Sequence, residues 1–221
     1  MGQEYETPTT NTLLDDLAHD LAATFPQVVM AYQRRLFAFA LRLTGSRQDA
    51  EDITQEAFVA AYVTLENYPA ERIRTLKLQG WLYSVTLNVW RHAVRGQRLL
   101  LAPLDDATAA GIEDAPAERP DALFEDRERR AELDTLVSQL PDRYRVAVIC
   151  YYFEDLSYQE IADLLDQPLG TVKSVIFRGV RLLRHLAHEQ DQRIEHRNGK
   201  EGQPWTTSMR AMDTLTSIRE A

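Results

Sequence analysis

Basic side chains gather near the end of the chain, with a serine and a phenylalanine among them. Guanidinium and ammonium groups bind guanine edges and phosphates, a serine hydroxyl can donate or accept, and an exposed phenyl ring can touch a thymine methyl. No Asp or Glu interrupts residues 168–188. These residue types predict contacts to duplex DNA if one element presents them on one face: Lys173, Ser174, Phe177, Arg178, Arg181 and Arg184.

A helix through this stretch would separate the basic residues from an apolar stripe. At about 100° per residue, the positions opposite the basic face are apolar or glycine, which predicts a buried face. They are Val172, Val175, Ile176, Gly179, Val180, Leu183 and Leu186. We expect Thr171 to cap this helix and to join the DNA-contacting set.

A short helix and a tight turn precede this helix. Ser157 and Glu160 have the spacing of a capping box, which predicts a helix start, and Pro168 with Gly170 predicts a turn. Two helices joined by a tight turn, the second of them basic, form the outline of a helix-turn-helix whose second helix reads DNA. The alternative is an ordinary helical pair with a basic, solvated face.

A second candidate surface lies on a helix predicted from Leu78 to Arg95. Aromatic rings interleaved with arginines suit single-stranded nucleic acid, because bases stack on the rings and guanidinium groups hold phosphates. The alternative is a helix that is buried on two sides. One apolar stripe holds Leu78, Trp81, Leu82, Val85, Val89 and Ala93, and the other holds Tyr83, Leu87, Trp90 and Val94, with Arg91 and Arg95 beside it.

Acidic residues cluster on the helix predicted after Ser46, at Asp49, Glu51, Asp52 and Glu56. No His or Cys lies nearby, so a solvated face or a docking surface for a basic partner is favoured over a metal site. The sequence also lacks a Gly-rich phosphate loop, a nucleophile elbow and a paired catalytic motif. We therefore expect no enzymatic activity, no cofactor and no metal.

The chain is acidic on average but basic where these surfaces lie. Its 221 residues carry 25 Lys and Arg against 34 Asp and Glu, a net charge of −9. Residues 25–98 nevertheless have ten basic and six acidic residues, whereas residues 1–24 have five acids and no Lys or Arg. Because partners respond to the local field, the average does not exclude nucleic acid.

Apolar residues recur at helical spacing throughout, and we predict an all-α fold of two small domains. The first helix is expected to open near Phe25 and Pro26 and to end at Gly45, and a loop with Arg72, Arg74 and Lys77 is expected before the helix from Leu78. The predicted parts are an acidic N-terminal segment (1–24), a helical domain (25–98), an acidic flexible linker (99–126), a helix-turn-helix domain (127–188) and a polar C-terminal extension (189–221). For the extension, disorder is favoured over a regulatory role.

Cysteine content and hydropathy indicate a cytoplasmic protein without membrane insertion. Cys150 is the single cysteine and is expected in the core. No apolar run approaches the length of about 18 to 20 residues that a membrane helix needs, and the N-terminus lacks a secretory signal pattern.

Three stretches together resemble the extracytoplasmic-function (ECF) sigma factors of bacterial RNA polymerase, within the sigma-70 family. DAEDITQEAFVAAY (49–62) resembles the family's core-binding region, QGWLYSVTLNVWRHAVR (79–95) its promoter-melting region, and LSYQEIADLLDQPLGTVKS (156–174) its −35-reading region. The resemblance implies a region 2-like helical bundle followed by a region 4-like helix-turn-helix. It also implies a protein that binds core RNA polymerase and directs promoter-specific initiation.

The resemblance implies a role for each candidate residue. The residues expected to contact the clamp helices of the polymerase's largest subunit are Asp49, Asp52, Gln55 and Glu56. Binding of the −10 strand falls to Tyr83, Asn88, Trp90, Arg91 and Arg95. Reading of the −35 element falls to Thr171, Lys173, Ser174, Phe177, Arg178 and Arg181. An anti-sigma factor is implied as a further partner.

The sequence departs from the family pattern in the −35-reading helix. The family usually has Arg where this chain has Val175, and an Ala-Arg pair where it has Gly179 and Val180. Fewer basic positions remain for the DNA backbone, and a glycine inside a helix costs about 1 kcal/mol relative to alanine. The −35 sequence therefore cannot be carried over from the family.

Two other functions fit parts of the sequence. A stand-alone helix-turn-helix regulator would bind duplex DNA as a dimer, but it needs neither the acidic helix nor the helix from Leu78. A helical protein-interaction module would not need the basic face predicted for the helix that contains Lys173 and Arg184.

Overall fold

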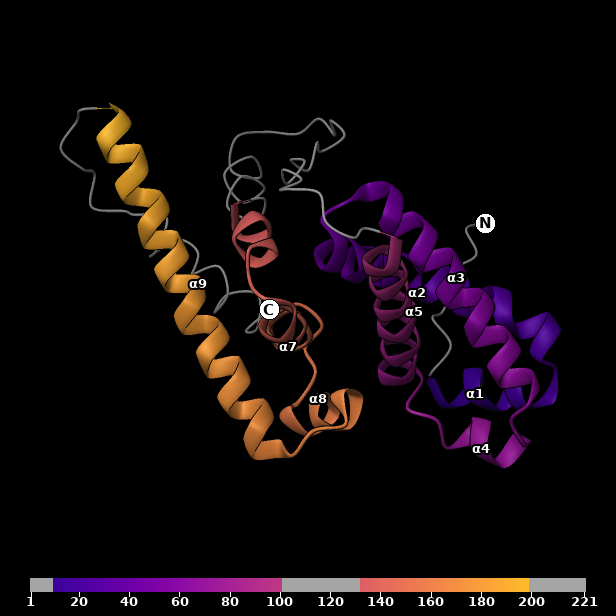
Figure 1. The fold of residues 1–221 in the computed structure, drawn as a ribbon. Coiled ribbons are helices and arrows are strands. Elements are labelled where there is room, and N and C mark those ends of the chain that lie inside the picture. The colour runs from indigo at the N-terminus through magenta and orange to yellow at the C-terminus, as the bar shows by residue number, and fades with distance from the viewer. Residues whose placement is uncertain (1–9, 101–131, 199–221) are drawn as a thin grey trace, which may run out of the picture. The chain divides into compact units, whose positions relative to one another are not determined.

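The computed structural model describes residues 10–100 and 132–198, and every regular element within these ranges is a helix. The predicted all-α fold is confirmed. Figure 1 shows the helices in chain order, from α1 near the N-terminus to α9. Their bounds are α1 Thr10–His19, α2 Leu21–Thr44, α3 Arg47–Glu66, α4 Ala70–Arg74, α5 Leu78–Leu100, α7 Asp142–Tyr152, α8 Tyr158–Leu165 and α9 Leu169–Asn198.

The chain divides into two compact units, which are described separately. One consists of Met1–Ala40 and Gln48–Leu104, the other of Leu41–Arg47 and Asp105–Ala221. The predicted linker lies mostly outside the described residues, and α5 runs to Leu100 rather than ending at Arg95. In the described part of the chain, none of the helices is long and apolar enough to cross a membrane.

The first unit is a bundle in which aromatic rings tie the helices together. Phe25 on α2 meets Tyr62 on α3 edge to face, with ring centroids 5.1 Å apart, and Phe39 on α2 meets Tyr83 on α5 at 4.9 Å. Such edge contacts add to the burial of apolar surface. The end of α2 follows the prediction, since Gly45 has a left-handed φ of 69° and donates its N–H to the carbonyl of Leu41 at 2.8 Å.

The N-terminal region contains more helix than the sequence predicted. Helix α1 buries Leu13, Leu14 and Leu17 and lies against α4. Helix α2 begins at Leu21 instead of near Phe25, because Asp20 caps it by accepting the Ala23 N–H at 3.0 Å.

The loop predicted around Arg72 and Arg74 is instead the short helix α4, which starts after Pro69. Pro69 is the N-cap residue of α4 and has an extended backbone, with φ of −65° and ψ of 149°. Proline suits a helix start because its ring fixes φ and because the missing N–H would have no partner there. An ion pair of 3.3 Å joins Arg74 Nε to Asp15 Oδ1 on α1. The basic residues of this segment therefore sit on an ordered element.

Helix α7 lies at the centre of the second unit and packs on both α8 and α9. Five consecutive residues from Val146 to Cys150 are buried, as expected for a helix covered on all sides. The capping box predicted for α8 is present: Ser157 Oγ accepts the Glu160 N–H at 3.2 Å, and the Glu160 carboxylate accepts the Ser157 N–H at 2.9 Å.

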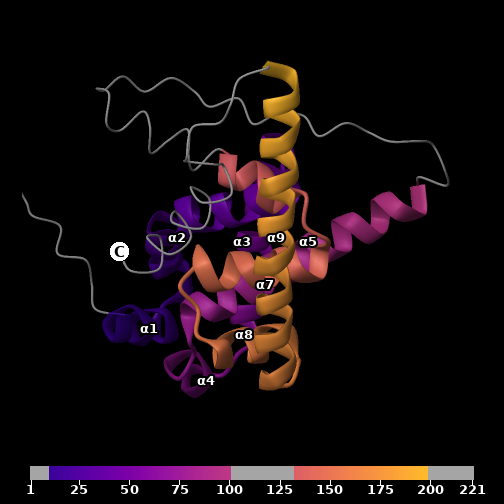
Figure 2. The same ribbon diagram turned by 90° about the vertical axis from the view of Figure 1, so that its left-hand side faces the viewer.

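Helix α9 is longer than predicted at both ends. It begins at Leu169 after a turn that contains Asp166 in the left-handed conformation, so Gly170 and Thr171 lie in its first turn and Thr171 is not the cap. It continues past His188 to Asn198, and Figure 2 shows it as one uninterrupted helix. Disorder was therefore the wrong expectation for residues 189–198, and residues 199–221 lie outside the described part.

Gly179 allows α7 and α9 to pack closely. A Cβ at this position would lie 2.8 Å from Val148 Cγ2 and 3.3 Å from Tyr144 Cβ, both on α7. The first of these distances is too short for real carbon atoms, so a side chain would push the helices apart. The glycine that departs from the family pattern thus has a packing role.

Candidate nucleic-acid interface

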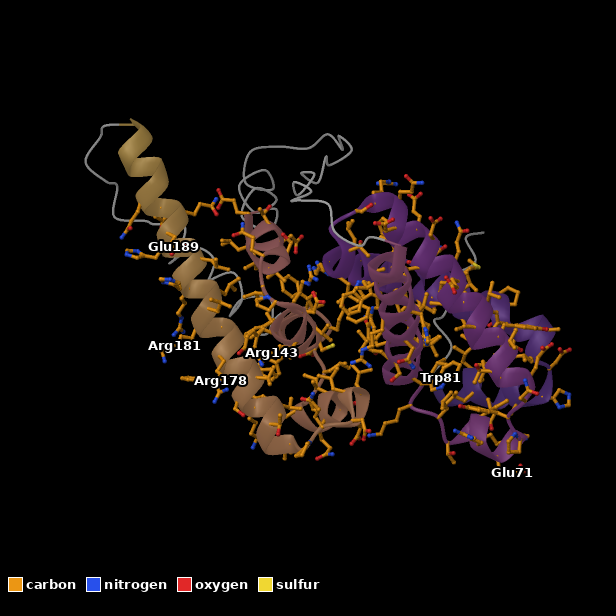
Figure 3. The ribbon with its side chains drawn as sticks, viewed as in Figure 1. Glu71, Trp81, Arg143, Arg178, Arg181 and Glu189 are labelled. Carbon is orange, nitrogen blue, oxygen red and sulfur yellow. The ribbon has the colours of Figure 1, made fainter. Side chains whose placement is uncertain are left out.

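The two faces predicted for α9 are present in the structure. Val172, Ile176, Gly179, Val180 and Leu183 are buried, with Val175 and Leu186 half-buried. The opposite face is exposed, and Figure 3 shows Arg178 and Arg181 extending from the side of α9 that points away from α7. The exposed set includes all six residues expected to read the −35 element: Thr171, Lys173, Ser174, Phe177, Arg178 and Arg181.

Phe177 is the most informative member of this face. Its side chain is 70% exposed, whereas every other aromatic residue in the described part of the chain is buried or half-buried. A large apolar side chain in solvent between cations marks a surface that a partner covers. Ser174 adds a polar group of defined orientation, because its hydroxyl donates to the carbonyls of Gly170 at 2.8 Å and Thr171 at 3.0 Å and leaves oxygen lone pairs facing outward.

Two of the five residues assigned to −10 strand binding are core residues. Tyr83 is 1% exposed and Trp90 is 5% exposed. Their burial favours the alternative of a helix buried on two sides, and for Tyr83 one covering residue is Phe39 on α2. Neither ring offers a face to a nucleic-acid base in this structure.

The other members of that set differ from the two buried rings. Asn88 is exposed and Arg91 is half-buried, so both can meet a partner at the surface of α5. The side chain of Arg95 lies outside the described part of the chain.

Two aromatic rings and one arginine form a cluster where α4 meets α5, and this cluster was not predicted from the sequence. The Arg72 guanidinium carbon lies 3.7 Å from the centre of the Tyr68 ring, and this ring lies 6.2 Å from that of Trp81. Both rings are half-buried, and Figure 3 shows Trp81 at the α4 end of α5. The signal available in the sequence was the group of cations at 72–77, flanked by aromatic residues on both sides.

The acidic residues of α3 share one exposed face. Asp49, Asp52, Gln55 and Glu56 are all exposed, while the opposite side of α3 is buried. The face continues with two apolar residues, Val59 at 64% and Val63 at 51% exposure. These valines were not predicted from the sequence, although their spacing of four places them on one side of a helix. The combined face fits a partner that offers both cations and apolar surface.

Metal-ligating clusters and shifted pKa values give no further candidate site among the described residues. In these residues there is no group of three or more His, Cys, Asp or Glu that could hold a metal ion. Burial raises the pKa of Tyr32 on α2, and the nearby Arg35 opposes this shift. Tyr32 belongs to none of the candidate surfaces.

Comparison with known proteins agrees with this arrangement. Residues 28–99 match the family Sigma-70 region 2, and residues 130–183 match Sigma-70, region 4. The ECF RNA polymerase sigma factor SigW of Bacillus subtilis is 33% identical over 168 residues, which cover 72% of this chain and 87% of SigW. The ECF RNA polymerase sigma factor SigE of Mycolicibacterium smegmatis is 34% identical over 179 residues, which cover 79% of this chain and 66% of SigE.

The fold of two helical units, one with an exposed basic helix-turn-helix, defines a DNA-binding protein of the sigma-70 type. With relatives at this level of identity and coverage, the chain belongs to the ECF sigma factors of RNA polymerase. The resemblance inferred from the three sequence stretches is confirmed.

Solved structures share the fold. The sigma factor RpoE from Bartonella quintana, in complex with the anti-sigma factor NepR, has a TM-score of 0.56 and 22% identity over 73% of this chain and 95% of that chain. CnrH, in complex with the cytosolic domain of CnrY, has a TM-score of 0.56 and 21% identity over 80% of this chain and 95% of that chain.

Proposed function

We propose that this protein binds core RNA polymerase and directs initiation at promoters that it recognises, without catalysing a reaction itself. The observation that carries the proposal is the exposed basic face of α9, where Phe177 is left in solvent. Membership of the ECF sigma factors favours this function over that of a stand-alone regulator. Residues 28–99 of the first unit match Sigma-70 region 2, and a stand-alone regulator would not need this region. A cytoplasmic location follows from the proposed partners.

The proposed −35 contacts use the two kinds of group on α9. Lys173 and Arg178 are suited to guanine O6 and N7, and Phe177 is suited to a thymine methyl. Ser174 is suited to a donor on a base edge, because its own hydroxyl proton is donated within α9. Thr171 and Arg181 lie at the two ends of this set, where phosphates follow the groove edge. The helix-turn-helix of α8 and α9 would place these side chains in the major groove.

The proposed −10 surface lies on α5 and α4. It consists of Asn88 and Arg91, with Arg95 further along α5, and of the cluster of Tyr68, Arg72 and Trp81. Base stacking needs accessible ring faces, which the half-buried rings of this cluster provide better than Tyr83 or Trp90. We retain 25–98 and 127–188 as the parts that carry the polymerase and promoter contacts.

Core polymerase binding is assigned to the exposed face of α3. The acids Asp49, Asp52 and Glu56, with Gln55, would meet cations on the clamp helices of the largest subunit, and Val59 and Val63 would add apolar contact. Charge complementarity of this kind steers association and fixes orientation. An anti-sigma factor is proposed as a competing partner, as the solved complex of the Bartonella quintana sigma factor with its anti-sigma factor suggests.

Run-off transcription with purified core polymerase tests the proposal, with the DNA upstream of the protein's own gene as template. We expect a specific transcript only when the chain is added. The double variant Phe177→Ala, Arg178→Ala should abolish it while still binding core polymerase. Absence of both a transcript and core binding by the unaltered chain would contradict the proposal.

A further inference from the structure

We propose that Tyr158 is a positioning residue for Lys173 and thereby strengthens the preference of this protein for one base pair of the −35 element. The inference rests on the proposed function of α9 and concerns a residue that belongs to a different helix. It arises from a chain of contacts that runs from α7 through α8 to the exposed face of α9.

The contact between the two residues is a cation–π interaction. Lys173 Nζ lies 5.6 Å from the centre of the Tyr158 ring, within the range of about 6 Å in which an ammonium group is attracted to an aromatic face. The Lys173 residue is exposed and Tyr158 is half-buried. The Tyr158 ring therefore contacts Lys173 while the lysine residue as a whole remains exposed.

The Tyr158 ring is itself held in place from α7. It stacks on the ring of Tyr151, with centroids 4.6 Å apart and planes at 27°. Its backbone is fixed as well, because Tyr158 is the first residue of α8 and follows Ser157, whose capping box with Glu160 defines the first turn. A ring anchored at both the side chain and the backbone can define a position for a flexible neighbour.

The position of Lys173 on α9 is equally defined. Lys173 lies in the regular helix α9, and the hydroxyl of its neighbour Ser174 donates to the carbonyls of Gly170 and Thr171 in the preceding turn. The lysine side chain, by contrast, is a flexible four-carbon stem, and it loses much rotamer entropy when its ammonium group is held in a single contact. A ring that restricts the ammonium group before DNA binds reduces this loss, and the gain applies only to the base that the restricted group can reach.

Two other roles for Tyr158 give different results and can be separated from this one. The phenol hydroxyl could contact a phosphate, which would strengthen binding to all sequences alike. The ring could instead hold Lys173 away from DNA, in which case its removal would sharpen the base preference. The variant Tyr158→Phe keeps the ring and removes the hydroxyl, and Tyr158→Leu keeps apolar bulk against Tyr151 and removes the aromatic face.

The test uses the full chain with core polymerase and a promoter library randomised across the −35 element. Bound templates are sequenced, and each preference is a ratio between templates in one reaction, so it is independent of the fraction of folded protein. Lys173→Met keeps the aliphatic length and removes the charge, and it identifies the base pair that Lys173 reads. Arg178→Ala, on the same face of α9, is the matched control.

We expect Tyr158→Leu to lower the preference at the Lys173 base pair roughly two- to fivefold, which corresponds to a cation–π contact of about 0.5 to 1 kcal/mol. Tyr158→Phe should retain the preference. In the Lys173→Met background Tyr158→Leu should have no further effect at that base pair, whereas in the Arg178→Ala background its effect should persist.

Three results would overturn the inference while leaving the proposed function intact: equal effects of Tyr158→Leu in both backgrounds, loss of preference in Tyr158→Phe as well, or an unchanged or sharper preference in Tyr158→Leu. If the unaltered chain with core polymerase enriches no −35 sequence at all, the proposed function fails, and the inference fails with it.

Discussion

Phe177 is expected to matter for DNA binding and to add little to the stability of the fold. An aromatic side chain buries about 150–250 Å² when it is covered, and here most of that surface remains in solvent. The folded chain therefore gains little from the ring. Its neighbours Lys173, Ser174 and Arg178 are exposed as well, so this face of α9 adds little to the core and is available for the proposed DNA contacts.

Replacement of Phe177 by alanine should accordingly leave the fold intact. We expect a change in the free energy of unfolding within about 0.5 kcal/mol, as for surface substitutions in general. Promoter-directed transcription should fall by roughly five- to 150-fold, since loss of one good base contact costs about 1 to 3 kcal/mol. Urea denaturation and run-off assays on the same preparation measure both. A large loss of stability would contradict the exposed placement.

Asn88 and Trp90 are two residues apart on α5 and should behave in opposite ways. Asn88→Ala should reduce promoter opening and leave stability unchanged, because Asn88 is exposed. Trp90→Ala should cost about 3 to 5 kcal/mol of unfolding free energy, because it leaves a cavity in the core. Opening of the −10 region can be followed by the reactivity of unpaired thymines. A stable Trp90→Ala variant with a pure opening defect would restore Trp90 to the DNA-binding set.

At the scale of elements, the fit between α7 and α9 depends on Gly179. Gly179→Ala should destabilise the second unit, since the added Cβ meets Val148 at 2.8 Å and the steric cost exceeds the gain in helix propensity. Gly170→Ala is the matched control in the same helix: no atom lies within 4 Å of its added Cβ, and the variant should gain up to about 1 kcal/mol. Thermal or urea unfolding distinguishes them. Equal stabilisation by both substitutions would contradict the close packing.

The exposed face of α3 makes a separate prediction about the polymerase. Glu56→Arg should weaken binding of the chain to core polymerase, because it places a cation against the cations of the proposed partner. Glu71→Arg, an equally exposed site on α4, is the control and should leave core binding unchanged. Competition against a labelled sigma factor for limiting core polymerase measures the difference. Equal behaviour of the two variants would remove α3 from the polymerase interface.

These elements also show which features could be predicted from sequence. The Ser157 capping box, the end of α2 at Gly45 and the two faces of α9 depend on neighbours three or four residues away, and all three are present. Helix α1, the burial of Tyr83 and Trp90, and the tight fit at Gly179 depend on other helices. A local pattern contains no information about which second helix covers an apolar stripe, so Tyr83 could not be distinguished from Tyr68.

At the scale of the whole molecule, a net charge of −9 has to be reconciled with DNA binding. The negative charge is concentrated in residues 1–24 and 99–130, whereas the exposed face of α9 is basic. Affinity for DNA depends on the number of phosphates neutralised. If only the four cations Lys173, Arg178, Arg181 and Arg184 of this face meet phosphates, log affinity should fall against log salt with a slope no steeper than about −3.6.

The acidic total predicts weak binding of the chain alone to promoter duplex, and much tighter binding once core polymerase is present. Arg184 lies on the basic face of α9 but outside the base-reading set, so Arg184→Ala should reduce the salt slope by about 1 without changing the −35 preference. Fluorescence anisotropy across a salt series measures the slope. An unchanged slope would show that Arg184 faces no phosphate.

The central claim is that this chain directs core RNA polymerase to specific promoters. Its most direct test is to transcribe fragmented DNA of the source genome with purified core polymerase, with and without the chain, and to sequence the 5′ ends of the transcripts. We predict a set of start sites that require the chain and share one −35 and one −10 sequence at fixed distances upstream. The same start sites with and without the chain would contradict the account.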